Sequence, residues 1–191
     1  MERFILICLV FIISLKSWSQ NDFVTKSIEI LQNSDLSITG DTNISMFECD
    51  FNTFFLEQGR QVIYHKSGDR IIFKSAILSL RNEGFDCGNK VINKDFHSLL
   101  KTNEYPKITL ELLEINLIKA DKGKASVRIT IAGKEKKFVV PIDILSSSTH
   151  RFIGKLKLDI QDFGLEPPKK MFGLIVIKKE VEINFNLAVA F

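Results

Sequence analysis

The chain of 191 residues is long enough for one sizeable domain and short for two. Its hydrophobic content of 45% and charged content of 26% are those of a globular protein and exclude an intrinsically disordered one. Lys and Arg are interspersed with Asp and Glu and the net charge is only +3, so no basic face for nucleic-acid binding is expected.

The first residues have the pattern of a secretory signal peptide. Arg3 supplies the positive start, and residues 4–13 form an apolar run that is too short to span a bilayer as a helix. Ser17-Trp18-Ser19 has the small-x-small pattern of a cleavage site. We therefore expect residues 1–19 to be removed, which leaves residues 20–191 as one periplasmic or secreted domain without a transmembrane segment. An uncleaved N-terminal anchor is the alternative.

Two cysteines, Cys49 and Cys87, remain in the expected mature chain. Exported proteins fold in an oxidising compartment, so this pair favours a disulfide. The alternative is two buried thiols that act as small apolar side chains. The sequence leaves the choice open because it does not give the distance between the two Cα atoms.

Most of the mature chain alternates apolar and polar residues with a period of two, which is typical of strands with one buried face. The strand-like runs cover residues 24–31, 36–38, 46–55, 70–80, 108–112, 127–131, 138–144, 156–160 and 181–189. Residues 133–136 are expected to form a hairpin turn between two of them. The pattern predicts an all-β fold in which an antiparallel sheet closes into a barrel, because closure removes exposed edges.

One segment has a helical period instead. Phe96, Leu99 and Leu100 lie at positions i, i+3 and i+4 and form one apolar stripe. Asn93 is the expected N-cap, and Pro106 disfavours helical backbone just before it. Since an isolated helix of this length is unstable, we expect it to dock by its stripe near an opening of the barrel.

The sequence contains no catalytic or metal-binding constellation. His65, His97 and His150 are far apart, and none has the spacing of a metal ligand. Residues 146–148 beside His150 are typical of a solvated turn, and residues 162–164 (DFG) lack the other kinase motifs. We expect no enzymatic activity, cofactor or metal. His97 is either a polar anchor at the barrel mouth or a surface histidine.

Aromatic and branched residues are concentrated on the buried faces of the strands, and phenylalanine alone accounts for 16 residues. Phenylalanine adds a large apolar area without a polar atom that needs a partner. An eight-stranded barrel is either filled by such side chains or holds one slender ligand. The residues expected to line a ligand tube are Phe47, Phe51, Ile108, Leu110, Ile129, Leu158, Ile183 and Phe185.

Five stretches, in chain order, are similar to a known family. They are residues 36–40 (LSITG) with Asn43 and 47–49 (FEC); 86–90 (DCGNK) leading into 96–101 (FHSLLK); 105–110 (YPKITL); 132–134 (AGK); and 162–165 (DFGL) with 167–168 (PP) and 171–173 (MFG). The fourth of these is short, whereas YPKITL after a short helix and DFGL are the most specific. Together they resemble the YceI-like family of exported, lipocalin-like proteins over nearly all of the mature chain.

The resemblance implies an eight-stranded antiparallel lipocalin-like barrel with one short α-helix near an end. It implies that a polyisoprenoid or similar amphipathic lipid lies in the apolar interior, for transport, storage or stress protection, and that there are no catalytic residues. Asp41 and Ser45 depart from the family pattern, as does the start of the helix, which lacks the arginines of many members. A homodimer is a possible assembly. The alternative function is a ligand-free interaction or stress-response scaffold with a filled barrel core.

Overall fold

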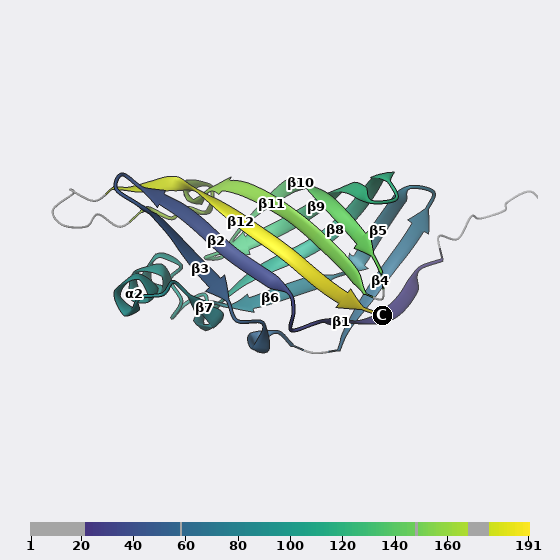
Figure 1. Cartoon of the computed structure of the whole chain (residues 1–191), viewed down its shortest axis with the longest axis horizontal. Coiled ribbons are helices and arrows are strands. Elements are labelled where there is room, and N and C mark those ends of the chain that lie inside the picture. Colours follow the sequence, from purple (N-terminus) through teal and green to yellow (C-terminus); the bar gives the residue numbers. More distant parts are fainter. Residues whose placement is uncertain (1–21, 58, 148, 168–175) are drawn as a thin grey trace, which may run out of the picture.

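The computed structural model describes residues 22–57, 59–147, 149–167 and 176–191 (Figure 1). The expected signal peptide, residues 1–19, and residues 168 and 171–173 of the last family-like stretch lie outside these ranges. The described residues form one sheet of twelve strands in which every pairing is antiparallel. The strands are β1 (Val24–Ile30), β2 (Asp35–Thr42), β3 (Met46–Phe51), β4 (Arg60–Ser67), β5 (Arg70–Ser75), β6 (Ile77–Arg81), β7 (Phe85–Asp86), β8 (Lys107–Lys119), β9 (Lys122–Ile131), β10 (Lys134–Ser146), β11 (His150–Asp159) and β12 (Ile177–Ala190).

The sheet closes into a barrel through β12, which pairs with β2 between Ile177 and Asn186 and with β1 at Val189 and Ala190. The closed path β1–β4–β5–β8–β9–β10–β11–β12 contains eight strands, and the remaining four extend the wall toward one end. Ser34, in the break between β1 and β2, is buried and its hydroxyl accepts a hydrogen bond from Ala188 N at 2.9 Å. The all-β antiparallel barrel expected from the sequence is thus confirmed.

A tight turn joins the two long strands β9 and β10. Ala132 (φ 47°) and Gly133 (φ 75°) both lie in the left-handed region, as in a two-residue hairpin turn. The expected turn over residues 133–136 is therefore too long, since β10 already begins at Lys134. A Cβ atom on Gly133 would lie 2.7 Å from Cε1 of Tyr105, so the absence of a side chain lets the Tyr105 ring pack against the turn.

Helix α2 (Lys90–Leu99) lies at the end of the barrel opposite the C-terminus (Figure 1). Its N-cap is Asn89, whose side chain accepts from Val91 N at 2.8 Å, so the expected cap at Asn93 is wrong. The Asn93 side chain instead accepts from Cys87 N at 2.6 Å and donates to Asp86 Oδ1 at 3.0 Å. The expected helix is present, but its N-cap lies four residues upstream of Asn93, because the Asn93 side chain binds the preceding loop.

The stripe of α2 docks against the barrel as expected. Phe96 and Leu100 are buried, and Leu99 packs against the same core. The ring centroid of Phe96 lies 5.3 Å from that of Phe85 in β7. Of the three short 3₁₀ turns in the described residues, two lie close to this end: η2 (Asn82–Gly84), which precedes β7, and η3 (Ile160–Phe163), whose Phe163 is almost fully buried. The third, η1 (Thr53–Phe55), contacts η2.

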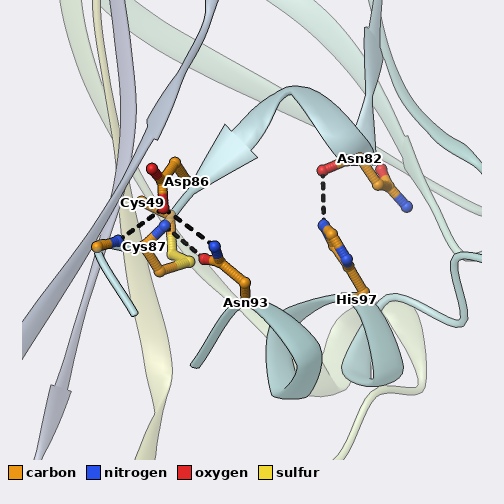
Figure 2. Close-up of a disulfide and its surroundings, with 7 residues drawn as sticks. Cys49, Asn82, Asp86, Cys87, Asn93 and His97 are labelled. Atoms are coloured by element: carbon orange, nitrogen blue, oxygen red, sulfur yellow. Dashed lines mark hydrogen bonds between the residues drawn. A yellow bond between two sulfur atoms is a disulfide. The ribbon is translucent and has the colours of Figure 1, made fainter. Parts of the chain in front are cut away.

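A disulfide and a buried asparagine tie the helical end together (Figure 2). Cys49 of β3 is bonded to Cys87, which precedes α2, with a Cα–Cα distance of 3.9 Å. Asn82 is 1% exposed and donates from Nδ2 to Thr102 Oγ1 at 3.0 Å and to Tyr105 O at 2.9 Å. His97 Nε2 lies 3.0 Å from Asn82 O, so His97 anchors α2 to η2 rather than standing free on the surface.

The hydrophobic core has two parts. The larger part fills the helical end of the barrel and includes Ile38, Ile108, Leu158 and Phe163. The smaller part is built around Ile115, Ala125, Val140, Ile142 and Ile144. α2 and η3 add Phe96, Ile160 and Phe163 to the side chains that the barrel wall contributes to the larger part, and together these side chains form a plug at the helical end. A cavity inside the barrel lies where the two parts meet, because its lining takes Leu36, Ile129 and Ile183 from the larger part and Ile115, Val140 and Ile142 from the smaller part.

Candidate functional site

A cavity of about 150 Å³ lies inside the barrel. Side chains from seven strands and from Ala76, the break between β5 and β6, surround it. The lining residues are Leu36, Ala76, Leu78, Leu110, Leu112, Ile115, Ala125, Val127, Ile129, Val140, Ile142, Phe152, Leu156, Ile183, Phe185 and Leu187. Within the described ranges, no polar side chain contributes to this lining. The cavity can therefore offer a guest only dispersion contacts and the exclusion of water.

The alternation of the strands explains why the cavity is dry. Phe152 and Leu156 of β11 share an inward face with Gly154, and they are paired with Leu187 and Ile183 of β12. Gly154 is paired with Phe185, and the ring of Phe185 covers the place of the missing side chain. Phe185 thereby extends across the inner face of β11 and forms part of the cavity wall.

The size of the cavity limits what it holds without rearrangement. An apolar cavity of about 150 Å³ accommodates a group of the size of benzene. A long hydrocarbon chain would require lining side chains to move. Phe185 and Phe152 are the largest of them and border the cavity on neighbouring strands.

Four of the residues expected to line a ligand tube border this cavity: Leu110, Ile129, Ile183 and Phe185. The other four do not. Ile108 and Leu158 have the expected inward parity but lie in the plug at the helical end. Phe51 is buried against Phe85 with a ring-centroid distance of 4.9 Å, and Phe47 lies over Gly40 at the edge of a separate groove beside α2.

Sequence reasoning missed several lining residues that the same parity would have found. Phe152 lies two positions before Gly154 on the same face, and Val140 and Ile142 belong to a run already recognised as a strand. Ala76 could not be found this way, because it breaks the run of residues 70–80 into β5 and β6. Both strands pair with β8, and Leu112 N donates to Ala76 O at 2.9 Å at the break.

Titratable side chains lie away from the cavity, mostly on the outer face. Asp50 of β3 is one example: it is exposed, yet desolvation by its surroundings and then the nearby carboxylates of Glu48 and Asp86 raise its pKa. In the described part of the chain, no group of three or more His, Cys, Asp or Glu side chains is arranged to hold a metal ion. Nor do the described residues contain a helix with the length and apolar character needed to cross a membrane.

The closed antiparallel sheet and its apolar interior define a lipocalin-like β-barrel protein. The model of the YceI-like domain matches residues 68–189, well over half of the chain. The chain therefore belongs to the YceI-like domain family, and the resemblance noted in its sequence is confirmed. No curated protein sequence matches the chain significantly.

Solved structures support the same fold. The crystal structure of BcnA from Burkholderia cenocepacia has a TM-score of 0.65 and 22% identity, over 83% of this chain and 96% of the other. A polyisoprenoid binding domain from Saccharophagus degradans, implicated in plant cell wall breakdown, has a TM-score of 0.60 and 14% identity, over 85% and 97%. The YceI protein of Campylobacter jejuni has a TM-score of 0.52 and 14% identity, over 89% and 84%.

Proposed function

We propose that this protein binds a polyisoprenoid or a similar amphipathic lipid inside its barrel. The observation that carries the proposal is the cavity lining, which is apolar throughout and is bordered by two phenylalanine rings. Burial of hydrocarbon is favourable by about 25 cal/mol per Å², so a dry interior needs few specific contacts to retain such a chain. The polyisoprenoid binding domain from Saccharophagus degradans shares the fold.

In this proposal the lipid tail enters the interior and the polar head stays outside. Leu110, Ile129 and Ile183 would exclude water from the tail, while Phe185 would move to lengthen the cavity. The lining offers no partner for a charged head group, and a buried unpaired charge would be costly. For the same reason the proposed function is binding without catalysis: the groups that could donate or accept protons do not border the cavity.

The proposed setting is the periplasm or another exported location, with the protein acting in transport, storage or protection. The signal-like pattern of residues 1–19 supports export. The bond between Cys49 and Cys87 supports it independently, because structural disulfides persist mainly in oxidising compartments.

Lipid extraction tests the proposal most directly. We expect an organic extract of the purified native protein to contain a prenyl lipid in about equimolar amount by mass spectrometry. Ala125→Leu should reduce that lipid strongly, because the larger side chain fills the cavity that Ala125 borders. Ala120→Leu, in the exposed turn between β8 and β9, is the matched control and should retain it.

The small volume of the cavity favours a second candidate, a ligand-free scaffold with a filled core. An extract without lipid, combined with no uptake of an added polyprenyl phosphate by the folded protein, would support the scaffold and contradict lipid binding. Thermal unfolding of each variant establishes that the protein compared is folded.

A further inference from the structure

Arg60 is an arginine on the inner face of the barrel wall. As the first residue of β4, it is paired with Ile28 of β1 and lies on the same strand face as the buried Val62. Ile30, two residues after Ile28, packs against the core, so this face is the inner one. The Arg60 side chain is only 18% exposed, whereas that of Arg81 at the end of β6 is 60% exposed. A guanidinium held inside a domain needs partners for its donors.

The guanidinium of Arg60 has a donor that remains unused. Nη1 donates to the carbonyl oxygen of Ile77, and Nη2 donates to Oε2 of Glu57 at 2.8 Å. Nε is buried and has no hydrogen-bond partner in the described structure. The Nε–H and Nη2–H groups of a guanidinium form a fork that fits two oxygen atoms of one anion. Glu57 fills only half of this fork, and a buried donor without an acceptor is costly.

The guanidinium of Arg60 also lies beside the apolar cavity. Ala76 and Leu78 border the cavity, and Ile77 between them supplies the carbonyl oxygen that accepts from Arg60. The guanidinium therefore contacts the backbone between two lining residues. Among the described strands, β1 and β4 contribute no residue to the lining, so Arg60 approaches the cavity from a side that carries none of its apolar wall.

Solvent reaches the other side of this guanidinium. The Glu57 side chain is 79% exposed, and its ion pair with Arg60 is screened by water. An exposed carboxylate in such a pair contributes little stability, so another anion can take its place. Arg60 thus stands between the solvent and the apolar interior, which is where the head of an amphipathic guest has to lie.

We propose that Arg60 binds the anionic head group of the amphipathic lipid whose tail lies in the cavity. The head group displaces the Glu57 carboxylate from Nη2, also accepts from Nε, and leaves the bond to Ile77 in place. The tail then extends past Ala76 and Leu78 into the apolar interior. This inference rests on the proposed function and narrows the ligand to amphiphiles with a phosphate or carboxylate head.

Pairs of ligands with the same tail test this head-group site. Geranyl phosphate and geraniol share one hydrocarbon chain, and octanoate and 1-octanol share another, so each pair differs only in its head. Calorimetric titration of the purified protein should show binding that is about tenfold tighter for the charged member, because a charge-assisted fork outweighs a hydroxyl contact. Such a preference in either pair supports the site, and the pair that shows it identifies the head group.

Variants of the ion pair identify the residue responsible. Arg60→Gln should abolish the preference for the charged ligand and leave the affinity for the alcohol unchanged. Glu57→Gln removes the competing carboxylate and should tighten binding of the charged ligand about threefold, again without effect on the alcohol. Arg81→Gln is the matched control, because Arg81 pairs with Glu83 at 2.7 Å but is exposed, and it should behave like the parent protein.

Thermal unfolding establishes that each variant is folded. Arg60→Gln also removes the donor to the carbonyl oxygen of Ile77, so it is the variant at risk. Glu57→Gln changes an exposed side chain and leaves that bond intact, so its gain in affinity tests the site even if Arg60→Gln does not fold.

Three results would overturn the head-group site while lipid binding stands. The first is equal affinity for the charged and uncharged members of both pairs. The second is a preference for the charged ligand that survives in folded Arg60→Gln or does not increase in Glu57→Gln. The third is an equal loss of preference in Arg60→Gln and Arg81→Gln, which would indicate unspecific attraction by positive charge. Binding of none of the four compounds would contradict the interior ligand itself, and the head-group site with it.

Discussion

The ring of Phe185 on β12 lies directly over Gly154 on β11, its partner in the strand register. A Cβ atom on Gly154 would lie 2.5 Å from Cζ of Phe185 and 3.0 Å from the carbonyl oxygen of Pro141. The glycine therefore makes room for an aromatic ring on the wall of the cavity. This pairing couples the stability of the barrel to the shape of its interior.

Gly154→Ala should push the Phe185 ring toward the cavity and destabilise the protein by about 1–3 kcal/mol, as overpacking of a core does. Urea unfolding measures the loss of stability, and uptake of a polyprenyl lipid measures the loss of space. The double variant Gly154→Ala/Phe185→Leu should recover part of the stability, because the smaller side chain clears the added methyl group. If the single variant is as stable as the parent, Phe185 is not held by Gly154.

The disulfide should make a large contribution to stability. It joins residues 38 positions apart, and the loss of loop entropy in the unfolded chain corresponds to about 4 kcal/mol. Reduction, or the double variant Cys49→Ala/Cys87→Ala, should lower the free energy of unfolding by about that amount. We expect the loss to be greatest near α2, where hydrogen exchange of the helix amides should accelerate before that of β9 and β10. Uniform acceleration would contradict this local effect.

Asn82 should be the most sensitive polar position at the helical end. It is almost fully buried, and Asn82→Ala would leave the carbonyl oxygen of Tyr105 without the donor it has now, at a cost of about 1–3 kcal/mol. Thermal unfolding of this variant can be compared with that of Thr102→Ala, which removes only the hydroxyl partner of the same side chain. A smaller shift for Asn82→Ala than for Thr102→Ala would show that Tyr105 finds another donor.

The loop before α2 should become less stable at acidic pH. Hydrogen bonds from the Asn93 side chain and then from Gly88 N, at 3.0 and 2.9 Å, lower the pKa of Asp86. A carboxyl whose pKa is lower in the folded state stabilises the fold above its unfolded pKa of about 3.9, and this contribution is lost as the pH falls through the folded-state pKa.

Asp86→Asn should therefore flatten the decline in stability below about pH 4, measured by urea unfolding at a series of pH values. Asp50 is the control of opposite sign. Its pKa is raised in the fold, so the ionised side chain lowers the stability of the fold, and this loss disappears as the pH falls through the raised pKa. Asp50→Asn should remove this change of stability with pH. An unchanged acid profile for Asp86→Asn would mean that the hydrogen bonds to Asp86 do not distinguish folded from unfolded protein.

The strands and the closed barrel could be predicted from the sequence because a period of two residues directly reports a sheet with one dry face. The position of the cavity could not. Ile108 and Leu110 have the same parity on β8, yet Ile108 lies in the plug and Leu110 borders the cavity. The difference depends on how far α2 and η3 reach along the barrel, which is a property of tertiary packing.

The helix start shows a similar limit. Asn89 and Asn93 both have the side chain of a good N-cap, and the local sequence does not separate them. The choice is decided by the loop that contains Cys87, whose backbone N–H occupies the Asn93 side chain. The disulfide likewise could be anticipated from the number of cysteines. That β3 lies next to the start of α2, however, is visible only in the folded structure.

The double pairing of β12 bears on how this barrel is assembled. Ser34 and Ala188, which meet at the junction of β1, β2 and β12, are 154 positions apart in the chain. β1 can pair with β4 and β2 with β3 early, but neither gains its second neighbour until β12 has been synthesised, so the ring has no closed precursor. Such a high contact order predicts folding in milliseconds to seconds, and an emerging chain would expose open strand edges until its final strand arrives.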